Sequence, residues 1–248
     1  MASMQVVSLD EQPEPDWNPD AVSAGRNAIG HPPVRILFLW PFARPINLRA
    51  QVVGHGWVQI GPVHLLLRPG LGVWRNVLGS VEEAQSALEG LQTAPGRQKV
   101  PQLRFGDGIW RPYHGYPVQP LTVDGRIWQR VFGTLVEMCG LFVVDLTAKR
   151  DAQGLSFELS YLFGSVDMRR LVLLVDSAQA DVDHCRRMIE ASWDGSDPRA
   201  TSSHNAAPPI LLYDSQSPAY VRAGFRGAFT GRATLPIAAK ALRCLGWS

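Results

Sequence analysis

Five short segments of this chain are apolar almost throughout and stand between turn-forming residues, and this pattern constrains the fold more than any other feature. The segments cover residues 35–40, 61–68, 141–146, 170–176 and 210–213. Uninterrupted apolar runs of this length are typical of strands that are buried on both faces, as in a parallel sheet. The sequence therefore predicts a strand at each of these segments.

Helical spacing recurs between and after these segments. Ser80 and Glu83 have the spacing of a capping box, and apolar residues follow them at helical intervals. Asp124 is placed to cap a second helix, which Gly140 ends. Further stretches with one apolar helical face cover residues 154–166, 182–193 and 233–245. Strands that alternate with amphipathic helices predict an α/β fold, with a mostly parallel sheet and helices on both faces.

The alternating pattern covers residues 34–248, which we expect to form a single α/β domain. Residues 92–120 are rich in Gly, Pro and aromatic residues without a sustained period, so we expect an irregular insertion there, mostly loop. Residues 1–33 carry prolines among acidic and small polar residues, a composition that buries too little apolar surface to offset the entropy of ordering. We expect this segment to be a disordered or extended tail that contributes nothing to the core.

The charge balance and the apolar run lengths exclude two classes of partner. The 248 residues include 24 Lys and Arg against 22 Asp and Glu, a formal net charge of +2. A dedicated nucleic-acid binder carries one-sided positive charge, so we expect no nucleic-acid partner. The richest apolar stretch, 132–146, is interrupted by Glu137 and is too short to cross a bilayer, so we expect no membrane span.

The cysteines and histidines show no metal-binding or disulfide pattern. Cys139, Cys185 and Cys244 are an odd number without pairwise spacing, which favours a reducing, cytoplasmic location. The six histidines also lack ligand spacing, so we expect no bound metal.

Acidic residues follow two of the predicted strands. Asp145 and Asp176 stand at strand ends, and Glu158 is expected in the first turn of the helix after Asp145. Ligands of parallel α/β sheets bind at the carboxyl ends of the strands, so these acids are candidate site residues. A structural interpretation stays open for each: Asp often caps the turn after a strand, and the helix macrodipole favours an acid in the first turn by about 0.3–1 kcal/mol.

The segment from Leu141 to Asp176 resembles the shared core of nucleoside deoxyribosyltransferase-like and TIR-like domains. Asp145 is similar to the strand-end aspartate of these domains, and Gly154 precedes Glu158 at their glycine-to-glutamate spacing. The order of elements over 34–218 also resembles bacterial TIR-like domains, including Trp128 before a helix. The resemblance implies a flavodoxin-like or TIR-like three-layer fold.

This sequence departs from the family pattern in two places. Phe157 directly precedes Glu158, where TIR-like relatives carry a tryptophan shortly before the glutamate. The pair Gly70 and Gly72 lacks the third glycine of a dinucleotide-binding loop, so no recognisable phosphate loop is present.

The resemblance implies a catalytic role for Glu158, which would attack or stabilise the anomeric carbon as an N-glycosidic bond breaks. That reaction forms an oxocarbenium-like sugar cation, which a carboxylate traps or stabilises. Asp145 is the candidate for holding a ribose hydroxyl. The candidates for phosphate binding are Arg44, Arg49 and Arg68, and those for stacking on a base or nicotinamide ring are Trp110, Tyr113 and Tyr116. Aromatic residues in loops also commonly anchor the loop to the core, so that interpretation stays open.

Two functions follow from these expectations. The first is a nucleotide N-glycosidase that cleaves NAD as a substrate rather than using it as a cofactor, in a bacterial defence or toxin setting. The second is a non-catalytic TIR-like module that binds a nucleotide signal or a protein partner, favoured by the missing tryptophan and phosphate loop. The resemblance also implies self-association, because such enzymatic domains often work only when assembled.

Overall fold

The computed structural model describes residues 4–13, 16–18, 21–22, 26–39, 55–67, 77–89, 102–103, 110–111, 115–146, 152–194, 207–217 and 237–247. The strands are β1 (Val6–Ser8), β2 (Ile36–Leu39), β3 (Val63–Leu67), β4 (Val77–Leu78), β5 (Gln102–Leu103), β6 (Trp110–Arg111), β7 (Val118–Val123), β8 (Leu141–Asp145), β9 (Leu171–Asp176) and β10 (Ile210–Tyr213). The α-helices are α2 (Val81–Glu89), α3 (Trp128–Met138), α4 (Ala152–Ser165), α5 (Val182–Asp194) and α7 (Ile237–Cys244), and the 3₁₀ turns are η2 (Trp57–Gln59) and η3 (Met168–Arg170).

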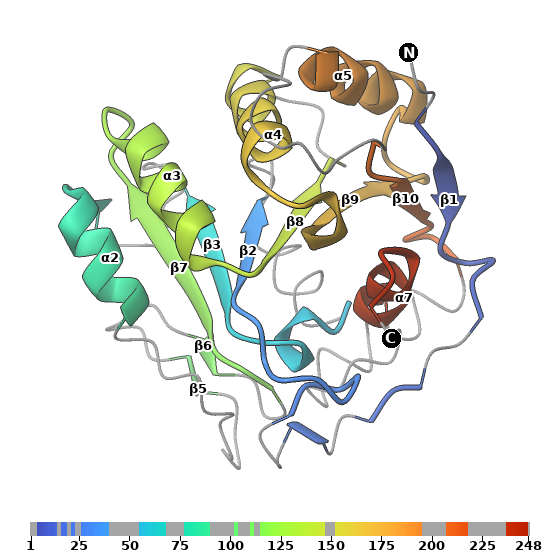
Figure 1. Ribbon diagram of the computed structural model, residues 1–248, viewed down its shortest axis with the longest axis horizontal. Coiled ribbons are helices and arrows are strands. Elements are labelled where there is room, and N and C mark those ends of the chain that lie inside the picture. The colour runs from blue at the N-terminus through green and yellow to red at the C-terminus, as the bar shows by residue number, and fades with distance from the viewer. Residues whose placement is uncertain are drawn as a thin grey trace.

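All of these strands belong to one sheet, in the order β1-β10-β9-β8-β2-β3-β7-β6-β5, with β4 paired to β7. Every pairing is parallel except those of β6 with β5 and with β7. Figure 1 shows α2, α3, α4 and α5 in an arc along one side of the sheet and α7 on the other. The predicted α/β class, with a mostly parallel sheet between two helical layers, is confirmed.

The six strands of four or more residues, numbered in chain order, lie in the order 3-2-1-4-5-6 across the sheet. This is one of the two common doubly wound orders, and flavodoxin-like sheets have the other, 2-1-3-4-5. The difference arises because β7 adds a further parallel strand outside β3. Successive strands extend to one side from β2 and to the other side from β8, so the point at which the topology switches direction lies between β2 and β8.

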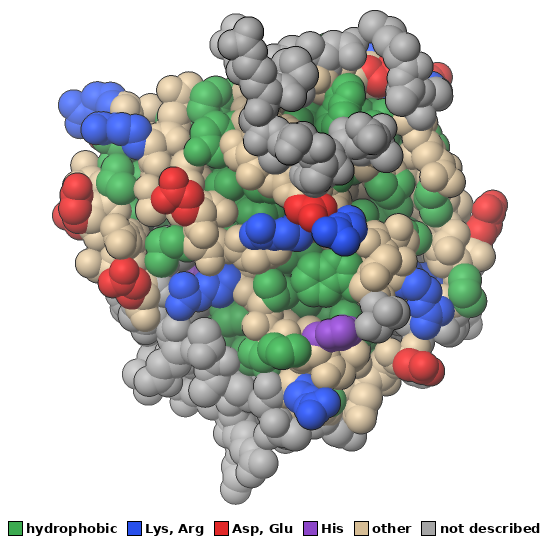
Figure 2. All heavy atoms as spheres, viewed as in Figure 1, with side chains coloured by type: hydrophobic (Ala, Val, Ile, Leu, Met, Phe, Trp, Pro, Cys, Tyr) green, Lys and Arg blue, Asp and Glu red, His purple; other side chains and the backbone are tan. Residues whose placement is uncertain are grey.

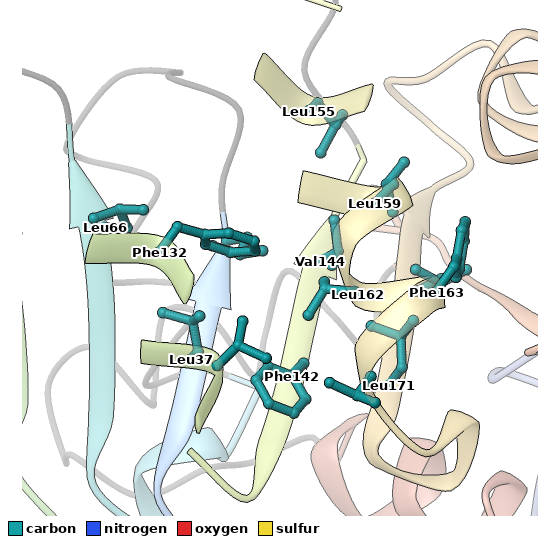
Figure 3. Packing of buried hydrophobic residues seen from close by; sticks show 14 of the residues in the cluster. Leu37, Leu66, Phe132, Phe142, Val144, Leu155, Leu159, Leu162, Phe163 and Leu171 are labelled. Atoms are coloured by element: carbon teal, nitrogen blue, oxygen red, sulfur yellow. The ribbon is translucent and has the colours of Figure 1, made fainter. Parts of the chain in front are cut away.

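Each face of the sheet has its own buried cluster. Phe142 and Val144 of β8 lie on the side of α3 and α4, as Figure 3 shows, whereas Leu141 and Val143 of the same strand belong to the cluster on the α7 side. Burial on both faces explains why the strand sequences are apolar at consecutive positions.

The neighbouring strands β8, β9 and β10 confirm the predicted central sheet. Val143 and Leu173 are fully buried and Leu212 is partly buried, each in one of these three parallel strands.

The segment before Pro33 contributes to both the sheet and the core, which corrects our expectation of a tail without core contacts. Val6–Ser8 forms an edge strand parallel to β10, and Met4 and Leu9 beside it are buried. The apolar residues of this strand are too few to stand out among the surrounding prolines and acids. Pairing with β10 supplies the backbone hydrogen bonds that this composition alone did not predict.

The region predicted as mostly loop, 92–120, contains three strand segments in its described part: β5, β6 and the first half of β7. Pro120 is an unusual residue inside a strand such as β7, because proline cannot donate a ladder hydrogen bond. In the structure Pro120 falls between Val118, which pairs with β6, and Thr122, which pairs with β4. The outer side of the strand has no described partner at Pro120, so the missing donor is tolerated.

The predicted caps form with small shifts. Ser80 Oγ accepts from the Glu83 N–H at 3.2 Å, and the Glu83 carboxylate accepts from the Gly79 N–H at 2.7 Å. Asp124 caps the turn that precedes α3, where its Oδ1 accepts from the Arg126 N–H at 2.8 Å. Among the described helices, none combines the length and the hydropathy required to span a membrane.

Candidate functional site at the carboxyl ends of the strands

Strands β8, β9 and β10 each end in a buried polar side chain: Asp145, Asp176 and Tyr213. Asp145 and Asp176 are 0% exposed. Tyr213 packs in the buried cluster on the α7 side, and Asp145 stands two residues after Val143 of that same cluster. Because alternate strand residues share a face, the strand-end side chains lie together on the α7 side of the carboxyl edge.

Asp145 is linked to Tyr213 across the intervening strand. The Tyr213 hydroxyl donates to Asp145 Oδ2 at 3.4 Å, although β8 and β10 are separated by β9. The Tyr213 ring meets the His55 ring edge-on, with their centroids 4.9 Å apart and an interplanar angle of 73°. The structure thus brings a carboxylate, a phenol and an imidazole together beside the β2/β8 switch point.

His55 fixes this site to helix α7. Its carbonyl oxygen accepts from the Ala238 N–H at 2.9 Å, in the first turn of α7. The side chain is fully buried, and this burial lowers the pKa of His55 from 6.5 to about 3. His55 is therefore neutral at physiological pH and contributes shape and a polar ring, not charge.

The Asp176 side chain accepts hydrogen bonds from the backbone of two adjacent loops. Its Oδ1 accepts from the Ala178 N–H and from the Ser215 N–H, each at 3.1 Å. Gln179 in the same loop donates from Nε2 to Ser215 Oγ at 2.9 Å. These contacts join the loop after β9 to the loop after β10, which is the turn-capping role that remained open for Asp176.

Glu158 lies in the second turn of α4. The helix begins at Ala152, so Glu158 is not in the first turn, which contains no acidic residue, and our expectation for its position is wrong. The helix is two residues longer at its start than expected, since Ala152 and Gln153 are also helical.

The side chain of Glu158 is half-buried at the border of the α4 core face. Leu155 and Leu162, one turn to either side, are buried. Phe157 next to it meets Trp128 of α3 edge-on, with centroids 5.1 Å apart. Glu158 thus belongs to the helical layer opposite α7, whereas Asp145 faces α7.

Cys185 of α5 contacts the backbone directly after the end of β8. Its Sγ lies 3.4 Å from the Leu146 carbonyl oxygen, to which the thiol donates. Burial raises the pKa of this thiol, and the negative charges of Asp181 and Asp145 raise it further. Cys185 is therefore a protonated packing residue and not a nucleophile at neutral pH.

The remaining predicted site residues do not join this group. Arg44, Arg49 and Arg68 lie outside the described residues, as does Tyr113. Trp110 pairs with Val118 at the amino end of β7, so the structure does not bring it together with Asp145 at the carboxyl edge. Tyr116 is buried with Val22 and Ala28, which confirms the alternative that it anchors its segment to the core.

Sequence reasoning missed two members of the site, His55 and Tyr213. Tyr213 had a usable signal, since it ends an apolar strand just as Asp145 does. His55 had none, because it stands between Gly54 and Gly56 outside any predicted element.

No group of three or more His, Cys, Asp or Glu side chains that could hold a metal ion occurs within the described ranges. Comparison with known proteins found no matching family model, no matching curated protein and no matching solved structure.

Proposed function

We propose that this protein binds a nucleotide at the carboxyl ends of β2 and β8 and cleaves its N-glycosidic bond, with NAD as the first substrate to test. The observation that carries the proposal is the position of Asp145, a fully buried carboxylate at the end of β8. It stands at the switch point, where doubly wound sheets bind nucleotides.

The chemistry of the site residues supports this choice. A carboxylate accepts hydrogen bonds, so Asp145 suits the hydroxyl groups of a ribose. Cleavage of an N-glycosidic bond develops positive charge on the sugar, which a second carboxylate stabilises or traps. We assign that second role to Glu158, the half-buried acid on the helix that directly follows β8. Three arginines follow β2 and β3 in sequence, Arg44, Arg49 and Arg68, and are the candidates for phosphate binding.

A second candidate is a non-catalytic module that binds the same ligand class. The observation that favours it is the separation of the two carboxylates into different layers, with Asp145 facing α7 and Glu158 on a helix of the opposite layer. In a binding module Asp145 alone would recognise the ribose, and Glu158 would be a helix residue without a chemical role.

The full chain, incubated with NAD and with nucleosides, tests both candidates. Chromatography of the mixture, with and without a crowding agent, measures release of nicotinamide or free base. Calorimetric titration of the same ligands measures binding. We expect binding together with release; binding without release selects the non-catalytic module, and the absence of both contradicts the proposal.

Self-association and a cytoplasmic location belong to the same proposal. The three cysteines are free thiols, which supports a reducing compartment. On the face shown in Figure 2, side chains of both charge signs are interspersed with hydrophobic ones, so this face is without a one-sided basic surface among its described residues. Measuring base release over a range of protein concentrations tests whether the activity requires assembly, since assembly makes the rate per chain rise with concentration.

A further inference from the structure

Four aromatic side chains meet between helices α3 and α4. Trp128 and Phe132 come from α3, and Phe157 and Tyr161 come from α4. Trp128 meets Phe157 edge-on with the ring centroids 5.1 Å apart, and Phe132 meets Tyr161 edge-on at 5.5 Å. Figure 3 shows the Phe132 ring extending from α3 toward α4. Aromatic rings therefore form the contact between these two helices.

The four rings differ in burial. Phe132 is 0% exposed and belongs to the core. Trp128, Phe157 and Tyr161 are half-buried and pack against that core. Phe157 and Tyr161 stand one turn apart on α4, with their centroids 6.1 Å apart and their planes tilted by 35°. Phe132 thus anchors the group, and the other three rings keep part of their surface accessible.

Glu158 lies beside these accessible rings. Residues three apart are neighbours on a helix surface, and Tyr161 follows Glu158 by three. The Tyr161 ring lies against α3, since it contacts Phe132 and its hydroxyl is 3.1 Å from the position of a Cβ at Gly133. Glu158 is half-buried, as the three accessible rings are. The side of α4 that carries this carboxylate therefore also carries an aromatic surface.

The rings and the carboxylate occur near the carboxyl edge of the sheet. Helix α3 follows β7 and α4 follows β8, so both helices begin at this edge. Trp128 is the first residue of α3, and Phe157 and Glu158 lie in the first half of α4. Ligands of parallel α/β sheets bind at the same edge. The aromatic surface is therefore close to the end of the sheet at which we place the nucleotide.

Aromatic side chains of this kind have a definite ligand preference. Their faces are negative and attract cations, most strongly for tryptophan, and flat heteroaromatic rings stack on them. The nicotinamide ring of oxidised NAD is both flat and positively charged, whereas its adenine ring is neutral. The N-glycosidic bond joins the nicotinamide ring to its ribose, so a ring bound here would bring that bond beside Glu158.

We propose that Trp128, Phe157 and Tyr161 bind the cationic nicotinamide ring of the substrate and select it over neutral rings. The inference rests on the proposed function for the identity of the substrate. It adds the substrate class, N-glycosides of a positively charged heteroaromatic ring. In this arrangement Asp145 holds the ribose, the three aromatic residues hold the ring, and Glu158 acts on the bond between them.

Two small compounds test the ring site apart from the ribose and phosphate contacts. Methylation of the nicotinamide ring nitrogen gives N-methylnicotinamide, a cation without ribose or phosphate, and unmodified nicotinamide is its neutral match. In the isotope-labelled full chain, the Trp128 indole N–H resonance is identified by its loss in Trp128→Phe. We expect the cation to shift this resonance at a concentration about fivefold or more below that required of nicotinamide, while the Trp193 indole stays in place.

Three results would overturn the proposal. In the first, neither compound moves the Trp128 resonance. In the second, both compounds move it at the same concentration, which would remove the preference for a cation. In the third, the Trp193 indole shifts as much as that of Trp128, which would show unspecific contact with exposed tryptophans.

Trp128→Leu and its control Trp193→Leu separate ligand binding from packing. Trp193 is also half-buried and meets Phe163 between α4 and α5 at 5.1 Å and 75°, against 5.1 Å and 77° for Trp128 and Phe157. Both variants should melt lower than wild type. We expect Trp128→Leu to weaken N-methylnicotinamide binding about three- to tenfold, and Trp193→Leu to leave it unchanged. Phe157→Leu is the second variant if Trp128→Leu does not fold, and wild-type affinity in the variant that folds contradicts the proposal.

The outcomes also separate this inference from the proposed cleavage. Binding of N-methylnicotinamide at Trp128, without release of nicotinamide from NAD, leaves the ring site standing and removes the catalytic proposal. Release of nicotinamide by Trp128→Leu and Phe157→Leu with the wild-type KM for NAD overturns the ring site and leaves the catalytic proposal standing.

Discussion

The Tyr213 hydroxyl lies 3.4 Å from Asp145 Oδ2, although these residues end strands that are not neighbours in the sheet. The contact spans β9 on the side that faces α7 and binds a fully buried carboxylate. Asp145 is therefore held at a fixed place beside the β2/β8 switch point, as a residue that orients a ligand must be.

Removal of the Tyr213 hydroxyl should destabilise the fold. Tyr213→Phe keeps the ring contact with His55 but removes a buried donor to Asp145. We expect a loss of about 0.5–1.5 kcal/mol in the free energy of unfolding, measured by urea denaturation. Tyr161→Phe, in the aromatic cluster of α3 and α4, is the control and should stay within about 0.5 kcal/mol of wild type. Equal stabilities of Tyr213→Phe and wild type would mean that the contact contributes nothing.

The N-terminal strand should be required for full stability. Leu9, which follows β1, is 1% exposed, whereas Val6 within β1 is 39% exposed. We expect Leu9→Ala to cost about 2–5 kcal/mol, because it leaves a cavity in the core. Val6→Ala should cost less than about 1 kcal/mol. Thermal and urea unfolding of the two variants check this difference, and similar small losses in both would restore the view that the segment is a dispensable tail.

Acid should destabilise the protein through two buried histidines. Burial lowers the pKa of His55 to about 3 and that of His64 to about 4, against 6.5 in the unfolded chain. Below pH 6.5 the unfolded state takes up protons that the folded state does not. Stability is therefore lost as pH falls from about 6.5, by up to roughly 1.4 kcal/mol per pH unit for each histidine. The contribution of His64 ends near pH 4 and that of His55 near pH 3.

Unfolding free energies measured at pH 7, 6 and 5 check this slope above the range in which most carboxylates titrate. His64→Gln should reduce the slope by about one proton. A stability that is constant from pH 7 to pH 5 would contradict the burial of both rings.

Two glycines should respond differently to alanine. A Cβ at Gly61 would overlap the backbone carbonyl of Val34, where the chain entering β2 lies against the chain entering β3. Gly61→Ala should cost about 1–3 kcal/mol or more, since a backbone atom cannot move aside as a side chain can. Gly125 has open space around its Cβ position, and Gly125→Ala should stay within about 0.5 kcal/mol. Melting temperatures of the two variants test the close approach of Gly61 to the Val34 backbone, and equal melting temperatures would contradict it.

The parts of the fold that could be predicted from sequence are those in which one strand or helix carries its own signal. The strand before Asp145 is apolar at consecutive positions, because both of its faces are buried. β1 and β7 depend on neighbours instead. β1 is short and draws its stability from pairing with β10. β7 tolerates Pro120 because its described outer neighbours, β6 and β4, pair with Val118 and Thr122 on either side of the proline. Neither condition is visible locally.

The site divides in the same way. Asp145 was predicted because strand ends define the carboxyl edge, and that edge is a property of each strand separately. His55 joins the site through the ring of Tyr213 and the start of α7, two elements distant in sequence. The position of Glu158 within its helix was wrong by one turn, because the helix was expected to begin at Gly154 and begins at Ala152.

The central claim is that Glu158 is the carboxylate that supports N-glycosidic cleavage, and base release by Glu158→Gln tests it most directly. Glutamine keeps the shape of the side chain but removes its charge, so nicotinamide release from NAD should fall by about a hundredfold or more while NAD binding and melting temperature stay close to wild type. Glu137→Gln, an exposed acid on α3, is the matched control and should release nicotinamide at the wild-type rate. A Glu158→Gln protein that releases nicotinamide as fast as wild type would contradict the claim and remove Glu158 from the mechanism.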